Sequence, residues 1–117
     1  MEILFILNDA PYGTEKSYNG LRLALSTLKE TEDVSVKVFL MADAIFCGLK
    51  NQKTPDGYYN TERYIKSIIK RGGEVKSCGT CCEARGVTQE MLIDKVEISN
   101  LKTLTEWTVN ADKVVTF

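Results

Sequence analysis

The sequence contains no histidine among its 117 residues. This excludes Ser-His and Cys-His catalytic pairs, histidine-ligated metal sites and a histidine general base. Any catalysis therefore has to use cysteine, a carboxylate, lysine, arginine, tyrosine or backbone groups. The formal net charge is -1, from 15 basic and 16 acidic side chains, and no basic block is present. We therefore expect neither nucleic acid nor an anionic membrane surface as a partner.

Long apolar runs are also missing, since no stretch approaches the roughly 20 residues needed to span a bilayer. Residues 1–7, MEILFIL, are too short for a signal peptide and carry no basic region. We therefore expect a cytoplasmic protein, in a compartment where thiols stay mostly reduced. The four cysteines then fit reactive or packing thiols better than a disulfide framework.

Hydrophobic patterning alternates between strand and helix along the whole chain. The predicted strands cover residues 3–7, 34–40, 74–78, 96–98 and 113–117. The predicted helical segments cover residues 17–30, 41–49, 64–69, 88–92 and 101–111. This order predicts one α/β domain over residues 1–117, built around a parallel sheet. The loops that follow the first three strands should open at one sheet edge, where ligands usually bind.

Three of the four cysteines lie in the segment CGTCCEARG, at the end of the third predicted strand. The spacing of Cys78 and Cys81 puts two sulfurs within reach of a disulfide or of a sulfur relay. A helix that begins near Thr80 would direct N–H groups toward these sulfurs, and Arg85 would add a positive charge. Thiolate is thereby favoured without histidine.

Other interpretations of the thiols remain open. Structural zinc would need Cys47 together with all three clustered cysteines, of which Cys81 and Cys82 are adjacent and ligate awkwardly, so we expect no metal. A thioredoxin-type dithiol also remains, although that chemistry usually follows the first strand. Cys47 lies on an apolar helix face and more simply packs in the core. Because adjacent side chains diverge on a helix, at most one of Cys81 and Cys82 should face the pocket of Cys78.

The loop after the first predicted strand, residues 8–14, has one glycine and neither of the common phosphate-loop motifs. We therefore expect no nucleotide cofactor. Asn8, Asp9 and Tyr12 are expected instead to line the thiol pocket. Trp107, on the apolar face of the last predicted helix, is expected to be a core or subunit-contact residue.

Taken together, the cysteine segment 78–86, the first loop 8–14 and the closing residues 107–114 resemble the DsrE/DsrF-like family, especially its YchN-like branch. The resemblance covers the whole chain. It implies a three-layer α/β/α sandwich with a mainly parallel five-stranded sheet, assembled as a homotrimer or homohexamer. It also implies sulfur relay, in which a cysteine accepts sulfur from a donor protein as a persulfide and passes it to an acceptor protein.

In this resemblance Cys78 matches the sulfur-carrying cysteine, and Cys81 matches a second cysteine of the YchN-like pattern. The resulting hypothesis is a sulfurtransferase or persulfide carrier. Cys78 is its nucleophile, Cys81 is a resolving or relay thiol, and Arg85 stabilises the anionic sulfur. The alternative is a non-catalytic oligomeric adaptor or a thiol redox sensor with a Cys78–Cys81 dithiol.

Overall fold

Five strands form one all-parallel sheet at the centre of the fold, in a computed structural model that describes residues 1–117. In spatial order they are β4 (Glu97–Ser99), β3 (Glu74–Cys78), β2 (Ser35–Leu40), β1 (Glu2–Leu7) and β5 (Lys113–Thr116). The chain moves outward from β1 to β4 and then crosses to the other side of β1. The predicted α/β class is confirmed, and every strand pair is parallel.

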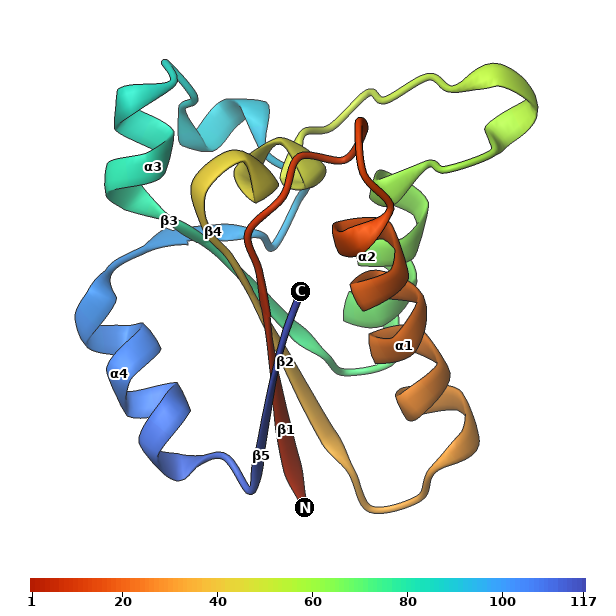
Figure 1. The fold of residues 1–117 in the computed structure, drawn as a ribbon, viewed down its shortest axis with the longest axis vertical. Helices are drawn as coiled ribbons and strands as arrows, with labels where there is room; N and C mark the ends of the chain where they lie inside the picture. The colour runs from red at the N-terminus through yellow and green to blue at the C-terminus, as the bar shows by residue number, and fades with distance from the viewer.

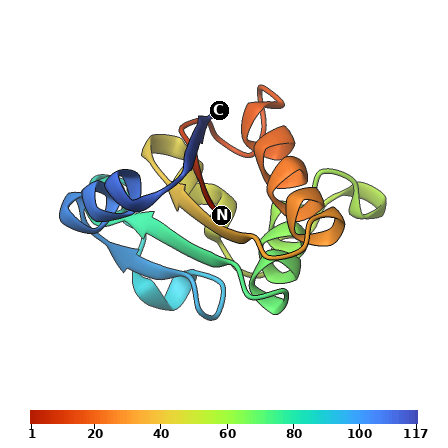
Figure 2. The same ribbon diagram turned by 90° about the horizontal axis from the view of Figure 1, so that it is seen from below.

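Helices cover both faces of this sheet (Figures 1 and 2). The helices α1 (Lys16–Glu30) and α2 (Thr61–Lys70) pack against each other on one face, and α4 (Leu101–Asn110) covers the other. The short helix α3 (Gly79–Ala84) stands at the carboxyl end of β3. The arrangement therefore has the three layers that the resemblance implied.

Three 3₁₀ turns complete the chain: η1 (Ala42–Gly48), η2 (Pro55–Gly57) and η3 (Gln89–Met91). The segment after β2, expected as a short helix, is thus the 3₁₀ turn η1. The other predicted bounds agree closely with the structure, except that α2 begins at Thr61 rather than near Tyr64. Its start is fixed by Asn60, whose Oδ1 accepts the N–H of Arg63 at 3.2 Å. No helix is both long and apolar enough to cross a membrane.

The core is one cluster of 24 buried residues that lies on both faces of the sheet. Leu4, Phe5 and Leu7 of β1 are fully buried or nearly so, as expected of a strand covered on both sides. On the α4 face, the Trp107 ring packs edge-to-face on Phe39 at a centroid distance of 5.9 Å. Trp107 is 8% exposed, so within a single chain it is a core residue.

The outer edge of β4 is closed by a side chain. Gln89 donates Nε2–H to the carbonyl of Val96 at 2.7 Å, and its Oε1 accepts the N–H of Ile98 at 2.9 Å. The amide thus takes the place of a neighbouring strand, which protects an edge that would otherwise invite pairing with another chain. It also holds β4 beside β3, where Ser99 pairs with Cys78.

Candidate functional site

The carboxyl ends of β1, β2 and β3 meet at one edge of the sheet, which is the upper edge in Figure 1. The loops that follow these strands open there, as predicted from the parallel order. Cys78 is the last residue of β3 and also the residue that caps α3. The sequence places it there because a β-type run ends at a glycine, from which the short helix starts.

Gly79 allows β4 to approach the start of α3. A Cβ atom at this position would lie 2.7 Å from the backbone oxygen of Ser99, which is closer than real Cβ contacts. Only glycine therefore fits without displacing the strand. The close approach sets Ser99 beside Cys78, with which it pairs in the sheet register.

Cys78 has hydrogen-bond partners suited to a thiolate. Its Sγ accepts the backbone N–H of Cys81 at 3.4 Å and lies 3.3 Å from the hydroxyl oxygen of Thr80. Burial alone would raise the pKa of Cys78. Hydrogen bonds from the side chains and backbone N–H groups of Cys81 and Thr80 outweigh burial and hold that pKa below its ordinary value.

Cys81 lies beside Cys78 but has the opposite tendency. Its Sγ accepts the backbone N–H of Ala42, from η1, at 3.1 Å. Burial and the neighbouring Cys78 sulfur raise the pKa of Cys81, and the Ala42 N–H and the charge of Arg85 only partly oppose this. The pKa of Cys78 is thus lowered and that of Cys81 raised, so within this pair Cys78 is the thiol that ionises first, and the Cys81 side chain favours that ionisation.

A polar link joins η1 to α3 behind the two thiols. Arg85 donates Nε–H to Asp43 Oδ1 at 2.8 Å and Nη1–H to the backbone oxygen of Cys81 at 3.1 Å. Ala42, just before Asp43, has a φ of 50°, which is rarely adopted by a residue other than glycine. This strained backbone aims the Ala42 N–H at the Cys81 sulfur, and backbone strain of this kind is concentrated at functional sites.

The remaining two cysteines do not take part in this arrangement. Cys82 is 1% exposed and its Sγ lies 3.4 Å from the Ser77 hydroxyl, so only one of the two adjacent cysteines faces the pocket. Cys47 is fully buried, and burial raises the pKa of its thiol to about 12. The prediction that Cys47 packs in the core is confirmed. No three potential metal ligands come together anywhere in the chain, so the four sulfurs do not form a common site.

The two thiols open on a cavity of about 630 Å³ on the α4 side of the sheet. Its walls come from the ends of β2, β3 and β4 and from the starts of α3 and α4. The lining residues are Phe39, Met41, Cys78, Gly79, Thr80, Cys81, Glu83, Ile98, Ser99, Asn100 and Leu101. A thiol beside a partly open, largely apolar cavity is an arrangement suited to a small substrate.

Asn8, Asp9 and Tyr12 do not line this cavity, which corrects the expectation that the first loop forms a wall of the thiol pocket. The reason is the strand order, because β2 and the η1 turn separate the β1 loop from β3. Asn8 instead donates to the backbone oxygen of Phe117, Asp9 accepts the Thr14 hydroxyl, and Tyr12 is 54% exposed. The first loop therefore shapes itself and the neighbouring surface.

Arg85 does not line the cavity either, although its charge acts on the thiols from behind. Sequence reasoning missed Ala42, Asp43 and the apolar wall at Ile98 and Leu101. Ala42 and Asp43 could have been identified from their position directly after β2, because the loop after this strand opens at the same sheet edge as the cysteine loop. No local motif marks the apolar wall.

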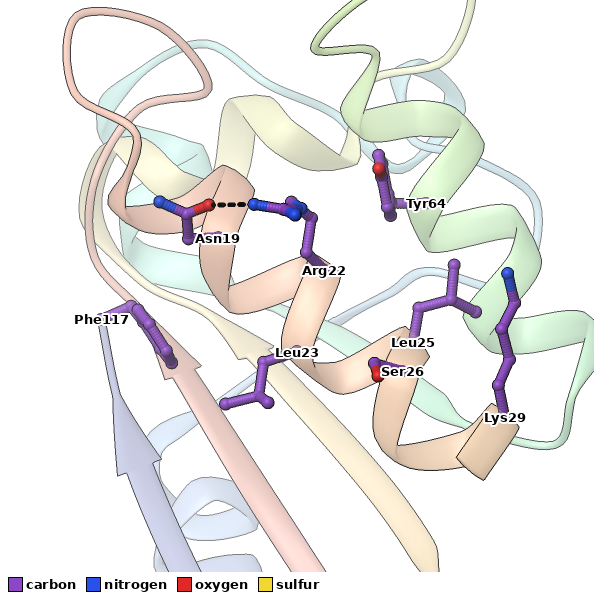
Figure 3. Close-up of a pocket in the computed structure, with 8 residues that line it drawn as sticks. All are labelled: Asn19, Arg22, Leu23, Leu25, Ser26, Lys29, Tyr64 and Phe117. Carbon is purple, nitrogen blue, oxygen red and sulfur yellow. Dashed lines mark hydrogen bonds between the residues drawn. The ribbon is translucent and has the colours of Figure 1, made fainter. Parts of the chain in front are cut away.

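A separate groove of about 590 Å³ runs along the outer side of α1 (Figure 3). Arg22 and Lys29 of α1, Tyr64 of α2 and Phe117, just after β5, contribute to it. Figure 3 shows Arg22 turned toward Asn19, whose Oδ1 accepts Nη1–H at 3.0 Å. Neither a thiol nor a carboxylate lines this groove, so it takes no part in the thiol chemistry.

Because the Cys81 side chain helps to lower the pKa of Cys78, two substitutions of Cys81 should change the reactivity of Cys78 differently. Cys81→Ala removes the side-chain donor, so the pKa of Cys78 should rise and its alkylation at neutral pH should slow several-fold. Cys81→Ser keeps a hydroxyl donor and should retain most of the low pKa. The measurement is the rate of Cys78 alkylation against pH, read by peptide mass spectrometry. Identical profiles for the two variants would contradict the donor role.

Comparisons with known proteins give the family and agree with the fold. The sequence pattern of the DsrE/DsrF-like family matches residues 1–117. The chain is 40% identical to Protein YchN of Escherichia coli (strain K12) over 116 residues, which are 99% of this chain and 98% of that protein. The crystal structure of the ychN protein from E. coli matches with a TM-score of 0.94 at 40% identity, over 100% of this chain and 99% of that one. Protein TusC homolog of Aliivibrio fischeri is 29% identical over 118 residues, covering 97% and 96% of the two chains. The protein described here therefore belongs to the DsrE/DsrF-like family.

Proposed function

We propose that this protein is a small cytoplasmic sulfur-relay protein, a persulfide carrier or sulfurtransferase that uses Cys78 as its nucleophile. The observation that carries the proposal is the environment of the Cys78 sulfur. It accepts the Cys81 N–H, contacts the Thr80 hydroxyl and borders a cavity at the carboxyl edge of the sheet. A thiol with a low pKa in such a place is suited to nucleophilic attack.

The transfer takes two balanced steps. In the first, the Cys78 thiolate attacks the outer sulfur of a donor persulfide, R–S–SH. A bond forms between Sγ and that sulfur, the S–S bond of the donor breaks, and its electron pair leaves on the donor thiolate. In the second, an acceptor thiolate attacks the outer sulfur of Cys78–S–SH, which returns Cys78 to its thiolate form. Neither step needs a separate oxidant or reductant.

In this scheme the loaded form persists as long as Cys81 stays protonated. If Cys81 were a thiolate, it would attack the inner sulfur of Cys78–S–SH, form a Cys78–Cys81 disulfide and release HS⁻. Burial, the largest influence on the pKa of Cys81, raises that pKa and favours the protonated thiol, so this loss should be slow at neutral pH. Cys81 thus supports the ionisation of Cys78 and becomes a resolving thiol only as the pH rises through its own pKa.

We further propose donor and acceptor proteins as partners, and a homotrimer or homohexamer as the assembled form, as the sequence resemblance implied. Exposed tyrosines at positions 12, 58 and 59 are residues of the kind that protein interfaces favour. Light scattering tests the assembly, and the mass of a single 13.1 kDa chain would contradict it.

A thiol redox sensor is the second candidate function. The observation that favours it is the contact between Cys78 and Cys81 within one helical turn, where the N–H of Cys81 bonds to the Cys78 sulfur. Oxidation would join the two sulfurs in a disulfide with loss of two hydrogens. Such a site would respond to oxidants and would not hold an added sulfur atom.

Intact-mass spectrometry after exposure to a persulfide donor separates the two functions. The carrier should gain about 32 Da for one added sulfur, mapped to the peptide that contains Cys78. The sensor should instead lose about 2 Da through disulfide formation. Rapid and complete loss of 2 Da with no loaded species at neutral pH would overturn the carrier assignment.

A further inference from the structure

The cavity beside Cys78 has an apolar lining. Phe39 and Met41 form its wall at the end of β2, and Ile98 of β4 and Leu101 at the start of α4 face them across it. Phe39 is 1% exposed and is held from behind by the Trp107 ring. Leu101 is 69% exposed and leaves apolar surface at the rim of the cavity.

Charge in the cavity is restricted to one acid. Glu83 of α3 is the single charged residue among those that line it, and no lysine or arginine does. The closest cation to the thiols along α3, Arg85, is directed to Asp43 and to the carbonyl of Cys81. Lys37 and Lys76, on the α4 face, stand over the Trp107 ring at 5.1 and 5.4 Å.

These charges disfavour an anionic ligand. A carboxylate or sulfonate that entered this partly open cavity would lose part of its water and approach both the exposed Glu83 and the Cys78 thiolate, with no cation in the wall to offset the cost. An uncharged apolar group would lose little on leaving water and would cover Met41, Ile98 and Leu101. The polar side chains of the wall, Thr80, Ser99 and Asn100, are uncharged donors, so they can hydrogen-bond an anion but supply no full positive charge.

We propose that the cavity selects sulfur carriers by charge: it takes persulfides whose carrier group R is uncharged and apolar, and it rejects anionic carriers such as glutathione persulfide and thiosulfate. This inference rests on the proposed function and names its substrate class. The same chemistry is offered by a small apolar persulfide and by a cysteine flanked by apolar residues on a protein segment. In both cases the step is the attack described above, with R–S⁻ as the leaving group.

Alkylation of Cys78 by a neutral and an anionic reagent tests the charge selection. Iodoacetamide and iodoacetate react with the same thiolate, so the ratio of their rates does not depend on the pKa of Cys78. We expect the ratio of the iodoacetamide rate to the iodoacetate rate to exceed that of a free small thiol by roughly tenfold. Repulsion of iodoacetate by one or two nearby negative charges would give a difference of this size. A ratio equal to that of the free thiol would overturn the inference while leaving a reactive Cys78, and hence the carrier function, intact.

Substitutions of Glu83 test whether the difference between the two alkylation rates arises in this cavity. Glu83→Lys should lower the ratio toward that of the free thiol, and Glu83→Gln should lower it partly. Glu30→Lys is the matched control, because Glu30 is exposed at the end of α1, on the other face of the sheet. Equal ratios for Glu83→Lys and Glu30→Lys would overturn the assignment to this cavity. Slow reaction of Cys78 with both reagents would overturn the carrier function itself, and the inference with it.

Loading experiments distinguish the two sources of an apolar carrier. Benzyl persulfide, a persulfide of the peptide acetyl-Leu-Cys-Leu-amide and glutathione persulfide are offered separately, and the gain of about 32 Da is followed with time. Faster loading from benzyl persulfide supports a small carrier, and faster loading from the peptide supports a protein segment. Fastest loading from glutathione persulfide would contradict the selection.

Discussion

Cys78→Ser should take up no sulfur from a persulfide donor under conditions that load the wild-type protein fully. The substitution changes one atom and preserves the size of a buried side chain, so the fold should remain. A serine hydroxyl is not ionised at neutral pH, and the chain has no histidine that could act as its base. Cys81 should not replace it efficiently as a nucleophile, because burial, the largest influence on its pKa, raises that pKa with or without the Cys78 sulfur.

The matched control for this experiment is Cys82→Ser. Cys82 is adjacent to Cys81 in sequence but lies buried against the Ser77 hydroxyl, away from the cavity. Its substitution should leave loading at the wild-type rate. The measurement is intact-mass spectrometry with peptide mapping of the added sulfur. Full loading of Cys78→Ser, with the added mass on any other cysteine, would contradict the assignment of the nucleophile.

Trp107→Ala should lower the free energy of unfolding by roughly 3–5 kcal/mol, the usual cost of removing a large buried aromatic side chain. The ring is 8% exposed and packs edge-to-face on Phe39, with two lysines over its faces. Because Phe39 is also a wall of the thiol cavity, the substitution should loosen that wall and weaken the charge selection as well. Urea unfolding followed by circular dichroism measures the change without relying on tryptophan fluorescence.

Val109→Ala is the control for this second experiment. Val109 lies on the same helix but is 77% exposed, so its truncation should change stability by no more than about 0.5 kcal/mol. Both variants should be compared at one protein concentration, since assembly would add to stability. A loss below about 1 kcal/mol for Trp107→Ala would contradict its role as the central residue of the α4 layer.

The position of Cys78 could be predicted because it depends on local sequence. A β-type run that ends in Cys-Gly indicates a strand followed by a turn, and the structure has β3 from Glu74 to Cys78 and α3 from Gly79. The divergence of adjacent helical side chains also predicted that only one of Cys81 and Cys82 would face the pocket. Which one does so depends on the residue where α3 starts, which is Gly79 in the structure and is not fixed by the sequence pattern.

The partners of the thiols could not be predicted because they depend on strand order. Parallel patterning brings the loops after β1, β2 and β3 to one edge but does not say which loop is adjacent to which. The structure puts η1, with Ala42 and Asp43, beside α3, and leaves Asn8, Asp9 and Tyr12 outside the cavity. The apolar wall from β4 and α4 likewise needs the crossover that returns the chain past the sheet.

The central claim is that Cys78, which is 8% exposed, is reached through the cavity at the edge of the sheet and ionises more readily than an ordinary cysteine. The most direct test is the rate of its alkylation by iodoacetamide as a function of pH, measured on the wild-type protein by quantifying the modified peptide. The rate should reach half of its maximum clearly below the value of about 8.5 that is typical of a free cysteine. A midpoint at or above that value, or a Cys78 that reacts only after unfolding, would contradict the account.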